Sequence, residues 1–274
     1  MPIKLIVLDL DGTLLKNRWK VHPKNLVAIQ KTQDKGIKVI IATGRAPSST
    51  IDIAKACLIH EQTGHIICYN GGNIIDITKE NKMDILYEKS LSTEQIQAII
   101  KFANDNNLAI WGYSTDNKTG LINRSSLRVK IMENFNHLPS KQIDETTTEG
   151  MYKILLFCKK KKQVNPILEK LNDIKDLELA TSSHSVIEIN PLGVNKATAV
   201  QFLCKKWGIK ADEVLACGDG MNDYKLIQWV KYGIAMKNGH PNLKLAAYDV
   251  TTKNTCGGVA KAIDKYVFPI SEFD

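Results

Sequence analysis

The stretch Asp9-Leu10-Asp11-Gly12-Thr13-Leu14 constrains this chain most, because two carboxylates follow directly on the apolar segment from Ile3 to Leu8. The apolar pattern stops after this stretch, which predicts a buried strand that ends in two acids and a glycine turn. Since residues i and i+2 of a strand point to the same side, we expect Asp9 and Asp11 to face one pocket. Ligands bind at that edge of open α/β sheets, although two such acids can also simply cap turns.

Composition limits the classes of protein to which the chain can belong. Its 274 residues are 43% hydrophobic and 24% charged, which is typical of a soluble globular protein. No apolar run reaches the roughly 18 residues of a membrane span, and no signal-peptide pattern precedes Asp9. The six cysteines form no CxxC pair, and most lie in apolar runs. We therefore expect a cytoplasmic protein with reduced thiols and no membrane partner.

The net charge of +8 carries little information about partners. Lysine is densest from Lys159 to Lys162, a run typical of a solvated loop. A nucleic-acid site would interleave aromatic residues with the charges or carry a known binding motif, and neither is present, so we expect no nucleic-acid partner. A positive field would help to draw in a small anionic molecule. The oligomeric state cannot be predicted from these features.

The first third of the chain alternates strands and helices. Pro23 begins an expected helix that Gly36 ends, and the apolar run Ile37 to Ala42 follows as a strand. This order predicts a parallel pair with a right-handed crossover. The second strand leads into Thr43-Gly44-Arg45, and a third strand from Ile66 to Tyr69 leads into another glycine turn. Residues 74–90 are expected to form a connection that contains a hairpin.

A change of pattern predicts a second, inserted domain over residues 87–188. It opens with Ser92-x-x-Gln95, a helix-capping pattern, and then mixes strands and helices without the motif of a strand followed by an acid. The predicted fold class is therefore α/β, with a parallel-sheet catalytic domain formed by residues 1–86 and 189–274. The insert is predicted to be a separate α+β unit.

The earlier pattern returns after residue 189. Lys196 begins a helix that Gly208 ends, and the strand Val214 to Cys217 leads into Gly218-Asp219-Gly220-Met221-Asn222-Asp223. Strand ends of a parallel sheet share one edge, so these acids can meet Asp9, Thr43 and Lys196 there. Carboxylates together with a lysine and a hydroxyl indicate a site for Mg²⁺ and a phosphate. The chain contains no Gly-x4-Gly-Lys-Ser/Thr sequence, which argues against a P-loop NTPase.

These stretches resemble the four motifs of the haloacid dehalogenase (HAD) superfamily. The motifs are Asp9 to Leu14, Thr43-Gly44-Arg45, Lys196 in Gly193-Val194-Asn195-Lys196, and Gly218 to Asp223. Their order, with a large insert between the second and third motifs, is similar to that of the Cof-type (subclass IIB) phosphatases. The resemblance implies a Rossmann-like core with a C2-type α/β cap, and hydrolysis of small phosphorylated metabolites.

The resemblance also implies a role for each matching residue. Asp9 would be the nucleophile that forms an aspartyl-phosphate, and Asp11 the general acid and base. Mg²⁺ would be the cofactor, held by Asp9, the backbone carbonyl of Asp11 and Asp219, with Asp223 either binding or orienting it. The phosphate oxygens would be held by Leu10 and Gly44 through their N–H groups, and by Thr43, Lys196 and Asn222.

The sequence leaves the substrate and some alternatives open. Sugar phosphates, FMN and pyridoxal phosphate all fit the resemblance. Trp111, Tyr113, Arg124 and His184 are candidates for substrate contact in the insert, with a core or surface role as the alternative for each. A phosphotransferase or mutase would use the same aspartyl-phosphate. A catalytically silent binding protein is the third hypothesis, although such proteins typically lose an acid of the first or last motif and this chain has all of them.

Overall fold

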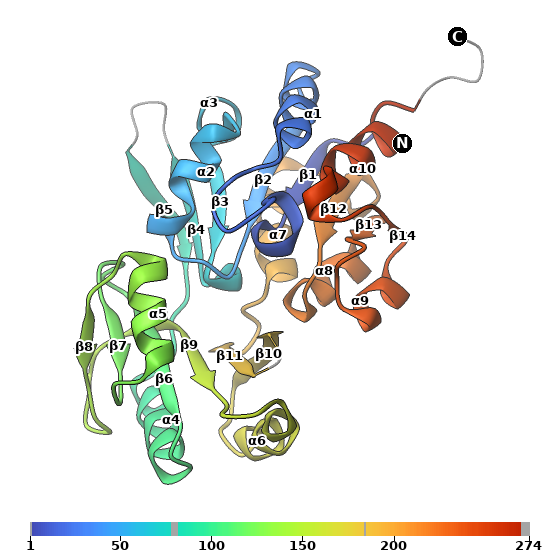
Figure 1. Ribbon diagram of the computed structural model, residues 1–274. Coiled ribbons are helices and arrows are strands. Elements are labelled where there is room, and N and C mark those ends of the chain that lie inside the picture. The colour runs from blue at the N-terminus through green and yellow to red at the C-terminus, as the bar shows by residue number, and fades with distance from the viewer. Residues whose placement is uncertain (1, 78–81, 184, 270–274) are drawn as a thin grey trace.

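The chain folds into two β-sheets with helices packed on them, as the computed structural model shows for residues 2–77, 82–183 and 185–269 (Figure 1). One sheet has the strand order β14-β13-β12-β1-β2-β3-β4-β5, and the other has the order β10-β11-β9-β6-β7-β8. The first sheet occupies the upper half of Figure 1 and the second the lower half. The predicted α/β class is confirmed.

The eight-stranded sheet is parallel from β14 to β3 and antiparallel beyond it. The six parallel strands form the predicted parallel-sheet core, and the antiparallel edge comes from residues 74–90. The expected hairpin adds two strands to the sheet, because a short connection can join only antiparallel neighbours. The strands are β1 (Leu5–Leu8), β2 (Lys38–Ala42), β3 (His65–Cys68), β4 (Asn73–Ile77), β5 (Met83–Glu88), β12 (Val214–Gly218), β13 (Tyr232–Ala235) and β14 (Asp249–Val250).

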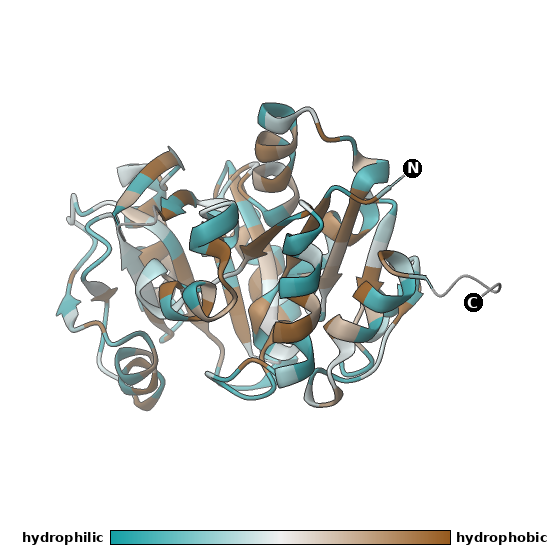
Figure 2. Ribbon diagram, turned by 90° about the horizontal axis from the view of Figure 1, so that it is seen from above, coloured by the Kyte–Doolittle hydropathy of each residue, from teal (hydrophilic) through white to brown (hydrophobic). Residues whose placement is uncertain are grey.

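Helices cover both faces of this sheet, which explains why its central strands are apolar on both sides. One face packs against α1 (Pro23–Asp34), α2 (Ile51–Ala56), α3 (Ile59–Gln62) and α10 (Gly258–Tyr266). The other packs against α7 (Lys196–Trp207), α8 (Tyr224–Trp229) and α9 (Pro241–Ala246). In Figure 2 the central strands are mostly brown, and the helices around them carry more teal.

The six-stranded sheet is built from the residues of the predicted insert. Its strands are β6 (Ala109–Ser114), β7 (Gly120–Ile122), β8 (Ser140–Gln142), β9 (Met151–Phe157), β10 (Leu177–Ser183) and β11 (Val186–Pro191). The outer face packs against α4 (Thr93–Asp105) and α6 (Val164–Leu171). Ser92 and Gln95 cap α4 reciprocally, as the sequence pattern predicted.

The inner face of the six-stranded sheet is only partly covered. Helix α5 (Leu127–Asn136) packs on it through Val129 and Met132. The part formed by β9, β10 and β11 instead faces the first sheet across a cavity. We propose that the chain divides into a core domain and an inserted cap near the predicted limits, 86/87 and 188/189, which fall within β5 and β11. None of the described helices is both long and apolar enough to cross a membrane.

Candidate active site

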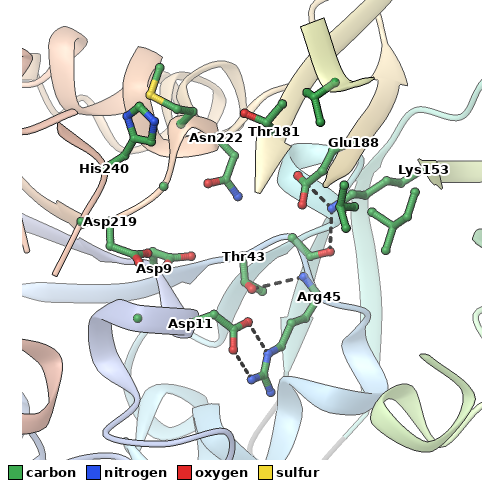
Figure 3. A pocket seen from close by; sticks show the side chains of 18 of the residues that line it. Asp9, Asp11, Thr43, Arg45, Lys153, Thr181, Glu188, Asp219, Asn222 and His240 are labelled. Carbon is green, nitrogen blue, oxygen red and sulfur yellow. Dashed lines mark hydrogen bonds and ion pairs between the residues drawn. The ribbon is translucent and has the colours of Figure 1, made fainter. Parts of the chain in front are cut away.

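The turns that follow the parallel strands open into a cavity of about 1240 Å³ between the two sheets. Its floor includes Asp9, Asp11, Thr43 and Asp219 from the first sheet, and its other wall includes Lys153 from the second. Figure 3 shows these side chains converging from different elements. The sequence predicted this convergence, because the carboxyl ends of parallel strands share one edge.

Asp9 and Asp11 both line the cavity, but for a different reason from the one expected. Strand β1 ends at Leu8, and residues Leu10–Leu14 form a tight turn in which the backbone of Asp11 and Gly12 is not helical, so strand alternation does not align the two acids. The turn depends on Gly12, whose φ is +76°. A Cβ at Gly12 would lie 2.1 Å from Asp219 Oδ2, so glycine is required both for the backbone conformation and for the space beside that carboxylate.

Lys196 lies at the centre of a buried cluster of charges. Its Nζ donates to Asp9 Oδ1 and to Asp223 Oδ1, each at 2.6 Å. Lys196 is fully buried at the start of α7, where the helix dipole disfavours a cation, so the two carboxylates must supply the compensation. Lys196 is therefore not a solvated surface lysine.

Burial and mutual repulsion disfavour the charged forms of Asp9 and Asp219. Burial raises the pKa of Asp9 to about 7, although Lys196 acts to lower it. Burial, with the nearby charge of Asp9, raises the pKa of Asp219 to about 8. Burial alone would lower the pKa of Lys196, but Asp223 and Asp9 outweigh it and hold that pKa above its ordinary value.

Asp223 has protein donors on both carboxylate oxygens. Oδ1 accepts from Lys196, and Oδ2 accepts from the backbone N–H groups of Asp219 and Gly220, each at 3.0 Å. The carboxylate therefore fixes both the lysine and the turn that carries Asp219. This arrangement favours the orienting role of the two that the sequence allowed for Asp223.

The guanidinium of Arg45 binds both oxygens of the Asp11 carboxylate. Arg45 Nε donates to Asp11 Oδ2 at 2.7 Å and Nη2 donates to Oδ1 at 2.5 Å. The same guanidinium lies over the rings of Trp19, at 5.0 Å, and Phe135, at 4.7 Å. Phe135 belongs to α5, so Arg45 links the first acidic turn to the second sheet. The structure buries Arg45.

The remaining predicted phosphate contacts surround the same floor. Thr43 Oγ1 accepts the N–H of Arg45 at 3.2 Å, and Gly44 lies beside it on the cavity wall. Asn222 lines the cavity and donates to Asn70 Oδ1 at 3.2 Å. Leu10 is fully buried, so its side chain packs in the core. The structure therefore brings these residues to one end of the cavity, close to Asp9.

Lys153 and Glu188 line the cavity but were not expected there from the sequence. Lys153 Nζ lies 3.1 Å from Glu188 Oε2, and the two side chains are 2% and 5% exposed. A usable signal was present, since each is the lone charged residue of an otherwise apolar strand, β9 or β11. A charged residue within such a strand needs a partner, and the two strands are neighbours in the sheet.

The four candidates for substrate contact in the insert have different outcomes. Tyr113 lines the cavity. Trp111 is fully buried in the core of the insert, and Arg124 donates to Asn104 and Asn107, so these two take the alternative core or surface role. His184 lies outside the residues that the structure describes.

The acids of the floor fit a bound divalent cation. Asp9, Asp219 and Asp223 offer carboxylate oxygens that all lie within 4.8 Å of one another. Hard oxygen donors of this kind suit Mg²⁺. A cation there would also offset the burial and the mutual repulsion that raise the pKa values of Asp9 and Asp219. The donor set therefore fits the predicted cofactor.

Comparisons with known proteins agree with this fold and identify a family. The family model of the haloacid dehalogenase-like hydrolases matches residues 6–263. The 5-amino-6-(5-phospho-D-ribitylamino)uracil phosphatase YcsE of Bacillus subtilis is 32% identical over 267 residues, which cover 97% of each chain. A putative phosphatase of Streptococcus pyogenes is 29% identical over 283 residues, which cover 97% of this chain and 99% of that one.

Solved structures extend the similarity to the whole fold. A haloacid dehalogenase-like hydrolase from Bacteroides thetaiotaomicron matches with a TM-score of 0.80 at 29% identity, over 96% of this chain and 99% of that one. The HAD subclass IIB sugar phosphatase BT4131 matches with a TM-score of 0.81 at 21% identity, over 96% of this chain and 98% of that one. The second similarity concerns the fold alone.

Proposed function

Because the chain belongs to the haloacid dehalogenase-like hydrolase family, we propose that it is a Mg²⁺-dependent phosphatase that cleaves small phosphate monoesters through an aspartyl-phosphate on Asp9. One observation carries the proposal: the Asp9 carboxylate lies on the floor of the cavity, held at 2.6 Å by a fully buried lysine and next to Asp219. An acid fixed in this way can attack an incoming phosphorus atom.

The first half-reaction is the transfer of the phosphoryl group to Asp9. A carboxylate oxygen of Asp9 forms a bond to phosphorus while the ester P–O bond breaks, and the alkoxide leaves with the bonding pair. Lys196, pinned between Asp9 and Asp223, supplies a fixed positive charge beside the non-bridging oxygens. Thr43, Asn222 and the N–H of Gly44 complete the positions from which those oxygens can be held.

Asp11 handles the proton in both halves of the reaction. It lies on the cavity wall and its side chain is 57% exposed, so it can reach a leaving group that enters from the cavity. It protonates the departing oxygen, and then takes a proton from the water that attacks the aspartyl-phosphate. Arg45 orients its carboxylate between these steps.

Asp9 and Asp219, with the backbone carbonyl of Asp11, are the residues that would hold the metal. When bound, Mg²⁺ screens the repulsion between the nucleophile and the anionic phosphate and stabilises the charge of the transition state. Asp223 keeps the Asp219 turn in place through the hydrogen bonds that its Oδ2 accepts from the backbone N–H groups of Asp219 and Gly220.

The proposed substrate class is small phosphorylated metabolites. Two relatives from Bacillus subtilis, 32% and 28% identical, are named as 5-amino-6-(5-phospho-D-ribitylamino)uracil phosphatases. The similarity over 97% and 96% of this chain supports a phosphorylated small molecule as the substrate class. We place the protein in the cytoplasm.

Release of inorganic phosphate from p-nitrophenyl phosphate tests the proposal. With Mg²⁺ the protein should release inorganic phosphate in the absence of any sugar, because water accepts the phosphoryl group. This result also distinguishes a phosphatase from a phosphotransferase, which would need a sugar acceptor. EDTA should stop turnover and Mg²⁺ should restore it. Asp9→Asn should abolish turnover while the circular dichroism spectrum stays unchanged. An active, folded Asp9→Asn protein would sink the nucleophile assignment.

A further inference from the structure

Strand β9 presents alternate residues to the cavity. Lys153, Leu155 and Phe157 line it, whereas Ile154 and Leu156 pack into the apolar core beneath α4 and α6. This is the alternation expected of a strand with two different faces. Lys153 is the residue of this row that touches the first sheet, because its Nζ donates to the Gly44 carbonyl at 3.2 Å. Leu155 and Phe157 lie farther along the strand, in steps of about 7 Å.

The partners of Lys153 hold it at the boundary between the two sheets (Figure 3). Glu188 Oε2 lies 3.1 Å from its Nζ and also accepts from Asn70 Nδ2. Asn70 in turn accepts from Asn222, one of the predicted phosphate contacts. The pair is thus fixed from the core side by the turns of the active site, next to the place where Thr43 and Gly44 would hold a phosphate.

Stability alone does not account for this pair. A buried ion pair usually contributes no more to stability than apolar side chains of the same volume, and often contributes less. The neighbours on this wall, Leu155, Phe157 and Val186, are apolar, so the fold readily fills such positions with hydrocarbon. A charged pair retained on the wall of a cavity, beside the reacting end, is better explained by recognition of a ligand.

We propose that Lys153 and Glu188 form a specificity-determining pair that binds hydroxyl groups on the carbon chain next to the phosphate ester. The inference rests on the proposed function. A hydroxyl both donates and accepts a hydrogen bond, which matches an ammonium beside a carboxylate. Gly44 O and Glu188 Oε2 account for two of the three N–H donors of Lys153. The pair has no net charge, so it does not call for a second anionic group on the substrate.

The remainder of the wall mixes apolar and polar side chains. Beyond the pair, the cavity is lined by Leu155, Phe157 and Leu168, and also by Lys161, Lys162 and Asn165. This part of the wall therefore does not select an apolar group. The substrate feature assigned by the pair is a phosphate ester whose carbon chain carries hydroxyl groups.

Two esters of equal length test the pair: D-ribitol 5-phosphate, and n-pentyl phosphate, which lacks the hydroxyl groups. The unsubstituted protein with Mg²⁺ should prefer the ribitol ester in kcat/KM. In the double variant Lys153→Met/Glu188→Leu the ratio of the two kcat/KM values should fall about 10- to 100-fold, as expected when hydrogen bonds to charged groups are lost. Glu188→Gln should lower the ratio in the same direction.

The ratio is independent of how much protein is folded, because both esters are assayed on the same sample. The matched control is Lys170→Met/Glu169→Leu, which removes two exposed residues of opposite charge from α6. It should leave the ratio of the two kcat/KM values within about twofold of that of the unsubstituted protein. An unchanged ratio in the Lys153→Met/Glu188→Leu protein would overturn the inference, as would a preference of the unsubstituted protein for n-pentyl phosphate. If the unsubstituted protein hydrolyses p-nitrophenyl phosphate but not the ribitol ester, this inference alone falls. If it hydrolyses none of the three esters, the proposed function falls with it.

Discussion

The guanidinium of Arg45 grips both oxygens of the Asp11 carboxylate, at 2.7 Å from Nε and 2.5 Å from Nη2. Arg45 is 3% exposed and packs over Phe135 of helix α5, so the acid proposed to move the proton is oriented by a residue that also contacts the insert. A bidentate fork fixes direction as well as distance. Arg45 therefore contacts both Asp11 and helix α5 of the insert.

Substitution of the proton-transfer acid should affect esters according to their leaving groups. In Asp11→Asn, an alkyl phosphate should lose about 10²- to 10⁴-fold in kcat, because its alkoxide needs a proton. p-Nitrophenolate leaves without one, so p-nitrophenyl phosphate should still phosphorylate Asp9, and only hydrolysis of the intermediate should slow. Stopped-flow absorbance should therefore record a burst of one equivalent of p-nitrophenolate, followed by slow turnover. Equal losses for both esters, without a burst, would contradict the assignment.

Mg²⁺ should stabilise the fold more at pH 8 than at pH 5.5. Burial raises the pKa of Asp219 from its ordinary 3.8 to about 8, so in this range the metal-free folded state binds more protons than the unfolded state. Its stability must then fall as the pH rises from about 4 towards 8. A bound cation favours the carboxylate form and removes this loss.

Thermal unfolding with EDTA or Mg²⁺ at the two pH values measures the difference. The rise in Tm caused by Mg²⁺ should be at least about 3 °C larger at pH 8, which corresponds to roughly 1 kcal/mol for a chain of this size. Asp219→Asn should abolish most of both the Mg²⁺ effect and its pH dependence. A Mg²⁺ effect that is larger at pH 5.5 would refute the placement of the metal.

Removal of the buried lysine should destabilise the protein mainly when no metal is present. Lys196→Met leaves Asp9 and Asp223 buried without their cation, a change that costs about 3–5 kcal/mol when one member of a buried pair is deleted. Urea unfolding in EDTA should record this loss, and Mg²⁺ should recover part of it. Lys205→Met, an exposed position on the same helix, is the control and should change stability by less than about 0.5 kcal/mol.

Much of the site could be predicted because its residues occupy strand ends and helix starts. Asp9, Thr43 and Asp219 follow apolar strands and Lys196 starts a capped helix, so local pattern and sheet topology together place them at one edge. The antiparallel edge strand β5 was harder to predict, because the pattern of residues 74–90 fits a hairpin outside the sheet equally well. Its pairing with β4 is settled only by the packing of the whole sheet.

The contacts between the two sheets could not be read from the sequence. The hydrogen bond from Lys153 to the Gly44 carbonyl joins residues that are 109 positions apart. Arg45 meets Phe135 of the insert in the same way. Each contact depends on how the second sheet sits over the first. Periodicity indicates which face of a strand is buried, but not what lies opposite that face. The lone lysine in β9 showed that a partner was needed, and only the fold identifies it as Glu188.

The space beside Asp219 should be as important for metal binding as its charge. Gly12→Ala introduces a Cβ at φ +76°, which costs about 1–2 kcal/mol in backbone strain, and places it 2.1 Å from Asp219 Oδ2. Gly36 has the same φ with nothing within 4 Å, so Gly36→Ala carries the strain without the clash.

Titration of activity with Mg²⁺ separates the two effects. Gly12→Ala should lose at least as much stability to urea as Gly36→Ala, because it adds the clash to the strain. Only Gly12→Ala should need at least about tenfold more Mg²⁺ for half-maximal activity, because displacing one ligand oxygen costs roughly 1.4 kcal/mol or more of binding free energy. Equal Mg²⁺ requirements for the two alanine variants would mean that the Asp219 carboxylate moves aside without loss, and would argue against its role as a direct ligand.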